Sequence, residues 1–460
     1  MGFYLGIDLG TSYFKAGLFD EKGTLSGLGR RYLKKETNDS LICELPVSVF
    51  WDTLRSCVKE AIKHAGISPE NIRAVSYSSQ ANSFILLDIE NEPLTPIILW
   101  PDKRAGEIEV NLDKLNDDDR FLEKTGLGIK LSEEFCIAKI SWFQKKQPAL
   151  WKQVKKVMSI SDYLTFMLTG TQYSDLSSSA MTGLLDITSC QWWSRSLDMF
   201  SLSPGLFSIP QRTGNHAGSL TKRGAELAGL TPGIPYYLGG LDHHCAAIGS
   251  GLLQNNYMSE STGTVLACVS YLHNYSPKKN SCMAPGLESG SYFQMAFDDN
   301  GASTLEWYQK EFAPELTIPE LLDMAGTVDK GCNGLIARPY ANKFKSLEGF
   351  ENIRDFHKHG HYVRAILEST ARSLAGLIEL IKEPSLDAGI ISTGGGARSK
   401  LWVKIKAEML NTSFFIPECS ETACMGAAMI GAYGTQELGT WPELTRNWVR
   451  FKDVVTPDAD

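Results

Sequence analysis

Two segments of the chain each have the pattern of a strand, a tight polar turn and a second strand, and the first of them constrains the fold most. An apolar stretch from Tyr4 to Ile7 ends at Asp8, turns through Gly10 to Ser12, and resumes as a strand from Lys15 to Phe19. Glycine allows backbone angles that point successive N–H groups into one concavity, and two hydroxyl groups follow Gly10. The turn is therefore predicted to hold phosphate oxygens, with Asp8 as an oxygen ligand for phosphate-bound Mg²⁺. An ordinary hairpin is the alternative for this segment taken alone.

The second segment repeats the pattern about one domain length later in the chain. It places the polar residues Ser259 to Thr264 before a strand of apolar and β-branched residues from Val265 to Tyr271. Two such hairpins predict two related lobes that face one nucleotide. The duplication resembles the actin-like ATPase superfamily, to which sugar kinases, actin and the heat-shock chaperone ATPases belong.

Length and charge narrow the functional class. A chain of 460 residues predicts two or three domains, and 43% hydrophobic with 21% charged residues indicates a globular protein with sizeable cores. The net charge of −8 argues against a nucleic-acid or membrane partner, because both kinds of surface require basic patches. Small-molecule chemistry is favoured. The oligomeric state is left open, with a homodimer among the candidates.

The cysteines and the apolar runs indicate the compartment. Ten cysteines are scattered without a Cys-x-x-Cys pair, which predicts buried free thiols and neither a disulfide framework nor a zinc site. No apolar run approaches the length of a membrane span, and Asp8 interrupts the apolar N-terminal stretch. A cytoplasmic enzyme is predicted.

Periodicity predicts the order of helices and strands. Apolar residues at helical spacing predict a helix that ends at Ala65, with Gly66 as its left-handed cap. Small residues in the last predicted helix are expected to permit close contact with a neighbouring element. The run 175–180 is rich in serine but too short for a linker. The predicted helices are 50–65, 139–143, 161–168, 362–382, 401–410 and 423–433, and the predicted strands are 72–79, 83–88, 94–100, 236–240 and 388–393.

Several short motifs, in their order and spacing, resemble the FGGY carbohydrate kinase family over nearly the whole chain. Singly each motif is modest, but together they are specific. The matching stretches are 6–15 and 261–264 (phosphate motifs), 161–164 with 168–170 (mid-domain signature), Gly239-Gly240-Leu241-Asp242 (catalytic signature), 394–399 (adenosine loop) and Gly426-Ala427-Ala428 (closing helix).

The resemblance implies an α/β fold of two actin-like (ribonuclease H-like) lobes, with ATP, Mg²⁺ and sugar in a cleft between them. The loop 231–235, with two prolines and a glycine, places the boundary soon after it and gives lobes 1–246 and 247–460. The implied reaction is ATP-dependent phosphorylation of a hydroxyl of a ketopentose, a deoxyketohexose or a related ketose or polyol. Closure of the lobes is expected to exclude water.

The resemblance also assigns the residues of the site. Asp242 is implied to accept the proton of the sugar hydroxyl, since phosphoryl transfer needs one proton acceptor late in the step. A turn or cap role is the alternative for a lone aspartate. The implied metal ligands are Asp8 and Asp242. The residues predicted to bind ATP are Gly10, Thr11, Ser12, Lys15, Thr262, Gly263, Thr264, Gly394, Gly395, Gly396, Ala397 and Ser399. Those predicted to contact the sugar are Gln80, Ala81, Asn82, Trp100, Asp102, Arg104, Asp242 and His243.

Departures from the family pattern leave the sugar open. Gln80-Ala81-Asn82 stands where xylulokinases usually have Gln-Met-His, and 342–345 replaces the family's Gly-Glu-Arg segment. The stretch 302–312 is more similar to L-fuculokinases. A different class, an actin-like assembly protein or chaperone-type ATPase, would need no polar sugar pocket. The alternating histidines 357, 359 and 361 have no completing cysteine or carboxylate cluster, so a metal site there is not favoured, and His361 is expected at the start of a helix.

Overall fold

The computed structural model describes residues 2–37, 41–106, 110–254, 257–344, 346–381 and 389–458. The chain forms two compact units that both combine helices and strands, so the predicted α/β class is confirmed. The first unit contains Met1–Gly249, Tyr271–Gln294 and Glu421–Trp448, and the second contains Ser250–Ser270, Met295–Ser420 and Val449–Asp460. The first unit initially ends at Gly249, three residues after the boundary expected at 246. Two later segments, 271–294 and 421–448, also belong to the first unit, so a single boundary does not describe the division.

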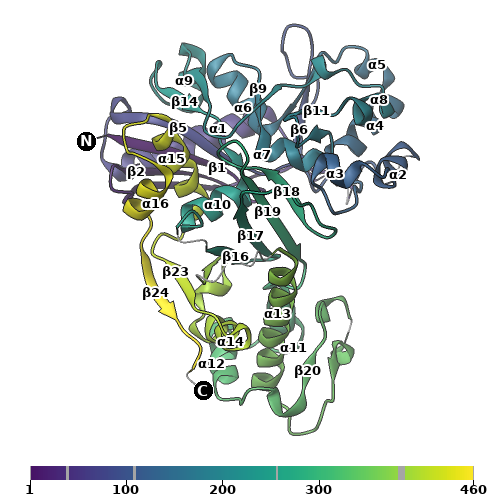
Figure 1. Cartoon of the computed structure of the whole chain (residues 1–460), viewed down its shortest axis with the longest axis vertical. Helices are drawn as coiled ribbons and strands as arrows, with labels where there is room; N and C mark the ends of the chain where they lie inside the picture. Colours follow the sequence, from purple (N-terminus) through teal and green to yellow (C-terminus); the bar gives the residue numbers. More distant parts are fainter. Residues whose placement is uncertain are drawn as a thin grey trace. The chain divides into compact units, whose positions relative to one another are not determined.

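The first hairpin lies within the main sheet of the first unit, between β5 and β3 (Figure 1). Strand β1 (Phe3–Leu9) pairs antiparallel with β2 (Tyr13–Asp20) and parallel with β5 (Ile72–Ser79). The order is β13-β14-β5-β1-β2-β3, and β15 (Gly240–Leu241) pairs parallel with β5. The predicted hairpin is therefore confirmed, and both of its strands extend further toward the turn than predicted.

Helices cover the two faces of this sheet. The odd residues of β1, including Leu5 and Ile7, join a core with helix α1 (Val47–Ala65), which ends at Gly66 as predicted. Successive strand residues point to opposite faces, so Gly6 lies on the other side. There a Cβ on Gly6 would overlap the Cys424 carbonyl of helix α15 (Thr422–Gly434), which confirms the expected close contact. Asp8 lies on this same α15 side.

Several of the remaining elements of the first unit, among them β6, α6 and α9, add buried residues to this core. A four-stranded sheet has the order β4-β7-β6-β8. The bounds are β3 (Leu25–Tyr32), β4 (Glu44–Leu45), β6 (Phe84–Leu87), β7 (Ile97–Ile98), α2 (Val110–Asn116), α3 (Phe121–Thr125), α4 (Cys136–Lys146), α5 (Pro148–Trp151), β8 (Lys156–Ser159), α6 (Ile160–Thr169), β9 (Tyr173–Asp175), α7 (Leu176–Ser179), β10 (Leu185–Asp186), β11 (Gln191–Trp192), α8 (Ser194–Met199), β12 (Ile209–Gln211), β13 (His216–Ser219), α9 (Lys222–Ala228), β14 (Pro235–Tyr237), α10 (Asp242–Ser250), β18 (Cys282–Pro285) and α16 (Trp441–Trp448).

The second hairpin lies in the sheet of the second unit. Strand β16 (Met258–Thr262) pairs antiparallel with β17 (Leu266–Leu272) and parallel with β22 (Ile390–Thr393). The long helix α13 (His359–Ile381) lies beside α11 (Ser303–Phe312) and α14 (Lys400–Leu410) (Figure 1). The other elements are β19 (Tyr292–Asp298), which spans the join at Gln294, α12 (Ile318–Gly326), β20 (Ile336–Ala337), β21 (Phe350–Glu351), β23 (Phe414–Pro417) and β24 (Phe451–Val455).

A few predicted elements differ from those observed. The strand expected at 94–100 is reduced to β7, because the chain already turns where the Asp102 N–H bonds the Leu99 carbonyl. The serine-rich run forms the short helix α7. Helix α13 begins before its predicted start and holds His361 in its first turn, as expected. Lys345, Lys382 and Ala388, which belong to predicted segments, lie outside the described residues. No described helix combines the length and the apolar character needed to cross a membrane.

Candidate active site

Three parallel strands end at one edge of the first unit's main sheet and bring polar side chains together there. Asp8 of β1 is aligned with Ser78 of β5, and Ser78 is aligned with Gly240 of β15. Asp242 follows β15 directly and begins helix α10. Because the carboxyl ends of parallel strands meet at the same edge, residues far apart in sequence form one site.

Asp8 is held by hydroxyl and ammonium groups on the α15 side of the sheet. Its Oδ1 accepts a hydrogen bond from the Ser78 hydroxyl at 3.1 Å, and its Oδ2 lies 3.7 Å from the Lys15 Nζ. Lys15 also forms an ion pair of 2.8 Å with Glu421, which directly precedes α15. Ser78 and Glu421 were not predicted for the site. The position of Glu421, at the start of a helix packed against β1, was the available signal.

Burial raises the pKa of the Asp8 carboxyl to about 6, although the Lys15 ammonium opposes the shift, and Asp242 and Glu421 raise the pKa further. The Lys15 ammonium thus lies between two carboxylates, Asp8 and Glu421, and the charge of Asp242 also acts on Asp8. In the described part of the chain, no group of three or more His, Cys, Asp or Glu side chains forms a complete metal site. Such an arrangement fits a hard cation that takes only one or two protein carboxylates and receives its other ligands from water and phosphate.

One residue of the serine-rich run, Ser177, holds the residues on either side of Asp242 and His243. The Ser177 hydroxyl of α7 accepts the Leu241 N–H at 2.9 Å, next to Asp242 in the chain, and lies 2.8 Å from His244 Nδ1. His244 is buried and stacks on Phe293 at 4.4 Å between ring centroids. Burial lowers the pKa of His244 to about 3, so this imidazole is neutral. The Asp242 Oδ1 accepts the His243 N–H at 2.8 Å.

The predicted sugar residues and the first hairpin turn share one hydrogen-bond network. The Thr11 hydroxyl accepts the Trp100 indole N–H at 2.8 Å and contacts Gln80 Oε1 at 3.5 Å. The Gln80 side chain is buried and also bonds Leu9 and Gly10 carbonyls. Thr11 was predicted to bind phosphate, yet its hydroxyl connects the turn to Trp100. The Trp100 side chain remains 37% exposed beside the turn.

Asn82 is also occupied within the chain. It has a left-handed backbone with φ 61°, its amide donates to the Met181 carbonyl at 3.0 Å, and its Oδ1 accepts the Cys136 N–H at 3.1 Å. Its neighbour Ala81 and the residue His243 are partly exposed. The Asn82 amide therefore joins the first residue of α4 to the short helical turn that contains Met181.

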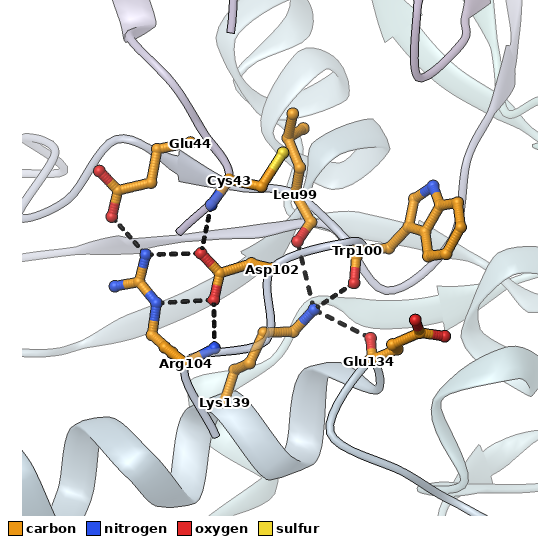
Figure 2. Close-up of polar contacts among 8 residues, drawn as sticks. All are labelled: Cys43, Glu44, Leu99, Trp100, Asp102, Arg104, Glu134 and Lys139. Carbon is orange, nitrogen blue, oxygen red and sulfur yellow. Dashed lines mark hydrogen bonds and ion pairs between the residues drawn. The ribbon is translucent and has the colours of Figure 1, made fainter. Parts of the chain in front are cut away.

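Asp102 and Arg104 form the buried ion pair shown in Figure 2. Asp102 is fully buried, and its carboxylate accepts the Cys43 N–H at 2.8 Å and two guanidinium N–H groups of Arg104 at 2.8 Å each. The guanidinium also pairs with Glu44. These contacts favour a positioning role for Asp102, since its oxygens already have donors.

Lys139 ties the same turn to helix α4. Its buried ammonium donates to the carbonyls of Leu99 at 3.2 Å, Trp100 at 2.9 Å and Glu134 at 2.9 Å (Figure 2). Burial lowers the pKa of Lys139 to about 8. The three N–H donors of the ammonium group each have one carbonyl acceptor. Lys139 therefore fixes the backbone of the turn that carries Trp100.

Removing Asp102 tests this network. Asp102→Ala leaves the Arg104 guanidinium buried beside Glu44 alone, which is expected to lower the free energy of unfolding by roughly 3–5 kcal/mol. Thermal unfolding measures the loss. Lys103→Ala is the matched control, because its partly exposed pair with Glu134 is expected to contribute less than about 1 kcal/mol. Equal melting temperatures for the two variants would contradict the positioning role.

The second unit contains a pocket of about 560 Å³ beside the predicted adenosine loop. Of the glycine and serine residues of the loop, Gly395 and Ser399 line it, whereas Gly396 and Ala397 are buried and are not part of its lining. The Ser399 hydroxyl caps α14 by accepting the Trp402 N–H at 3.2 Å. Arg398 of the predicted loop also lines the pocket. The lining residues outside the predicted loop are Ala302, Leu305, Glu306, Ile318, Pro319, Leu322, Asp323, Lys400, Leu401 and Trp402.

The second hairpin turn packs on the start of α11. The Gly263 carbonyl accepts the Ala302 N–H at 2.7 Å, and the Thr264 carbonyl accepts the Ser303 hydroxyl at 3.2 Å. The Thr262 side chain is fully buried and bonds within the unit. The turn and the pocket are therefore parts of one compact region of the second unit.

The fold is that of an actin-like ATPase. A xylulose kinase structure from Lactobacillus acidophilus superposes with a TM-score of 0.89 at 21% identity, covering 100% of this chain and 94% of that one. Models of the FGGY family of carbohydrate kinases match residues 3–249 (N-terminal domain) and 304–435 (C-terminal domain). The chain belongs to the FGGY family of carbohydrate kinases, and it is a sugar kinase.

Two curated relatives extend over nearly the whole chain. A xylulose kinase of Lactococcus lactis is 30% identical over 99% of this chain and 92% of its own length. A probable L-xylulose kinase of Haemophilus influenzae is 25% identical over 94% of this chain and 90% of its own length. These relatives favour the kinase over the assembly protein or chaperone-type ATPase that the hairpins alone left open.

Proposed function

We propose that the protein transfers the terminal phosphoryl group of ATP to a hydroxyl of a ketopentose of the xylulose type. The observation that carries this proposal is the meeting of Asp8 and Asp242 at adjoining ends of parallel strands, in a chain 30% identical to a xylulose kinase. The second unit supplies a pocket of a size that suits adenosine.

Asp242 is proposed as the base and Asp8 as a ligand of Mg²⁺. Asp242 stands at the start of α10, where Ser177 holds the Leu241 N–H of the preceding residue and the His243 N–H donates to the Asp242 Oδ1, so the carboxylate is oriented to accept the sugar proton. The raised pKa of Asp8 fits a carboxylate that gains a cation. When bound, Mg²⁺ neutralises charge on the phosphates. Lys15 is proposed to bind phosphate, held in place by Glu421.

Trp100 and His243 are the proposed contacts to the sugar, because both side chains are at least partly exposed. Gln80, Asn82, Asp102 and Arg104 are proposed to support them, since their polar atoms bond within the chain. Ala81 adds a small apolar wall. The preference for one sugar over another would then depend on the shape of the surface around Trp100, His243 and Ala81 more than on a charged side chain.

The test is ADP release with saturating ATP across D-xylulose, L-xylulose, D-ribulose, a 1-deoxyketose, glycerol and no sugar. We expect kcat/KM to be highest for one of the two xyluloses and the rate without sugar to be far lower. A faster reaction with the deoxyketose or glycerol would overturn the ketopentose assignment. Equal ADP release with and without every sugar would overturn the kinase assignment in favour of an ATPase.

A further inference from the structure

A fully buried ion pair lies beneath the second hairpin turn. Lys406 of α14 and Glu260 of β16 are both 0% exposed, and the Lys406 Nζ lies 2.8 Å from Glu260 Oε1. Neither residue has a part in the proposed chemistry. The pair joins the hairpin strand to the helix that follows the glycine loop.

The pair acts on Thr262, the last residue of β16 before the turn. The Thr262 hydroxyl donates to Glu260 Oε2 at 2.8 Å and accepts from the Lys406 Nζ at 2.6 Å. A hydroxyl has one hydrogen, so this arrangement fixes the Thr262 side chain in one rotamer. The Glu260 carboxylate also accepts the Ser392 hydroxyl of β22. Each charge is therefore satisfied by named partners.

Thr262 is also where the hairpin touches the glycine loop. Gly394 has φ 78°, and a Cβ there would lie 2.7 Å from the Thr262 carbonyl oxygen. A Cβ on Gly396 would lie 2.7 Å from the Thr262 Cβ. Lys406 also lies 5.7 Å from the centre of the Trp402 ring, which lines the pocket. Turn, loop and pocket wall are thus connected through one buried network.

Stability does not explain this pair. Two charges lose their hydration when buried, and apolar residues of similar volume are often as stabilising or more so. Apolar residues could not form the two hydrogen bonds that the Thr262 hydroxyl makes with Glu260 and Lys406. The pair therefore contributes a fixed spacing between the hairpin turn and the glycine loop, which matters to a ligand that contacts both.

We propose that Lys406 and Glu260 are positioning residues for the nucleotide, which hold the hairpin turn and the glycine loop at the spacing required by the phosphates and adenosine of one molecule. The inference rests on the proposed function, because it takes ATP as the donor. It predicts that loss of the pair weakens the binding of ADP more than the binding of adenosine. Adenosine would contact only the pocket, whereas ADP would contact both the pocket and the hairpin turn.

The double variant Glu260→Leu/Lys406→Met removes both charges and keeps apolar volume in the core. Each single variant would leave a buried charge without its partner, so the double variant is decisive. Lys404→Met is the matched control, because Lys404 lies on the same helix and pairs with Glu408 and Asp458 near the surface. Affinities for ADP and for adenosine are measured by titration calorimetry, with melting temperature as the check on folding.

We expect the double variant to bind ADP about tenfold or more weakly and adenosine within about twofold of the wild type. The KM for ATP should rise while the KM for sugar holds. Equal ADP affinities of the double variant and Lys404→Met would overturn this inference and leave the proposed function standing. A wild type that binds no ADP would overturn the proposed function and this inference with it.

Thr262→Val provides a second measurement if the double variant does not fold. Valine keeps the shape and leaves Lys406 and Glu260 paired, but removes the hydroxyl through which the pair acts. The same selective loss of ADP binding over adenosine binding is expected. Unchanged ADP affinity in a folded Thr262→Val protein would overturn the inference.

Discussion

Asp242→Asn is expected to lower kcat by roughly 10²–10⁴-fold while ADP still binds. The amide has nearly the shape of the carboxylate and retains an oxygen that can accept the His243 N–H, so the start of α10 should be preserved. It lacks the basicity to take the proton of the sugar hydroxyl. Steady-state ADP release with the best sugar measures kcat, and titration calorimetry measures ADP binding.

Glu226→Gln is the control for Asp242→Asn, because it makes the same chemical change on the exposed face of α9 in the same unit. It should leave kcat unchanged. Turnover of Asp242→Asn close to that of this control would remove Asp242 from the role of base. Loss of ADP binding together with a lower melting temperature would show that Asp242 supports the fold.

Asp8→Asn is expected to abolish most of the activity and yet to stabilise the metal-free protein. Burial raises the pKa of Asp8 from 3.8 to about 6, so the ionised group costs the folded state roughly 3 kcal/mol at neutral pH. Asparagine is neutral, can still accept the Ser78 hydroxyl, and leaves Lys15 paired with Glu421. Thermal unfolding without Mg²⁺ measures the gain, and the Mg²⁺ titration of ADP release measures the loss.

The pH dependence isolates the contribution of Asp8. Its folded pKa lies above the unfolded value, so the destabilising effect is full above pH 6 and disappears below about pH 4. The melting temperature of Asp8→Asn should therefore exceed that of the wild type most at pH 7, and the difference should shrink as the pH falls. Asp52→Asn, at an exposed position, is the control. An unchanged Mg²⁺ requirement in Asp8→Asn would remove Asp8 from the role of metal ligand.

Trp100 illustrates how the structure refines a prediction drawn from a motif. The sequence places Trp100, Asp102 and Arg104 together after an apolar run, which favoured a shared role in sugar binding. In the structure, Trp100 is exposed, whereas Asp102 and Arg104 bond to each other and to Cys43 and Glu44. A polar residue looks the same in sequence whether its carboxylate faces a ligand or a buried guanidinium, so only the fold separates the two roles.

Local patterns in the sequence determined the elements of this protein. The hairpin of β1 and β2, the helix α1 with its cap at Gly66, and the small residues of α15 follow from turn chemistry, periodicity and residue size, which act between near neighbours. The ordered motifs determined the family. They also pointed to Asp8 and Asp242, because each stands at the end of a predicted strand beside a glycine-containing segment.

Tertiary structure alone decided which distant residues complete the site. Glu421 reaches Lys15, Ser177 fixes the backbone before Asp242, and Lys406 pairs with Glu260 beneath Thr262. None of these pairs has a signature in a window of sequence, since each is made by elements that meet only when sheets and helices pack. Burial then sets the charge states of Asp8, Lys139 and His244, because the cost of an ionised group depends on the surroundings that the fold provides.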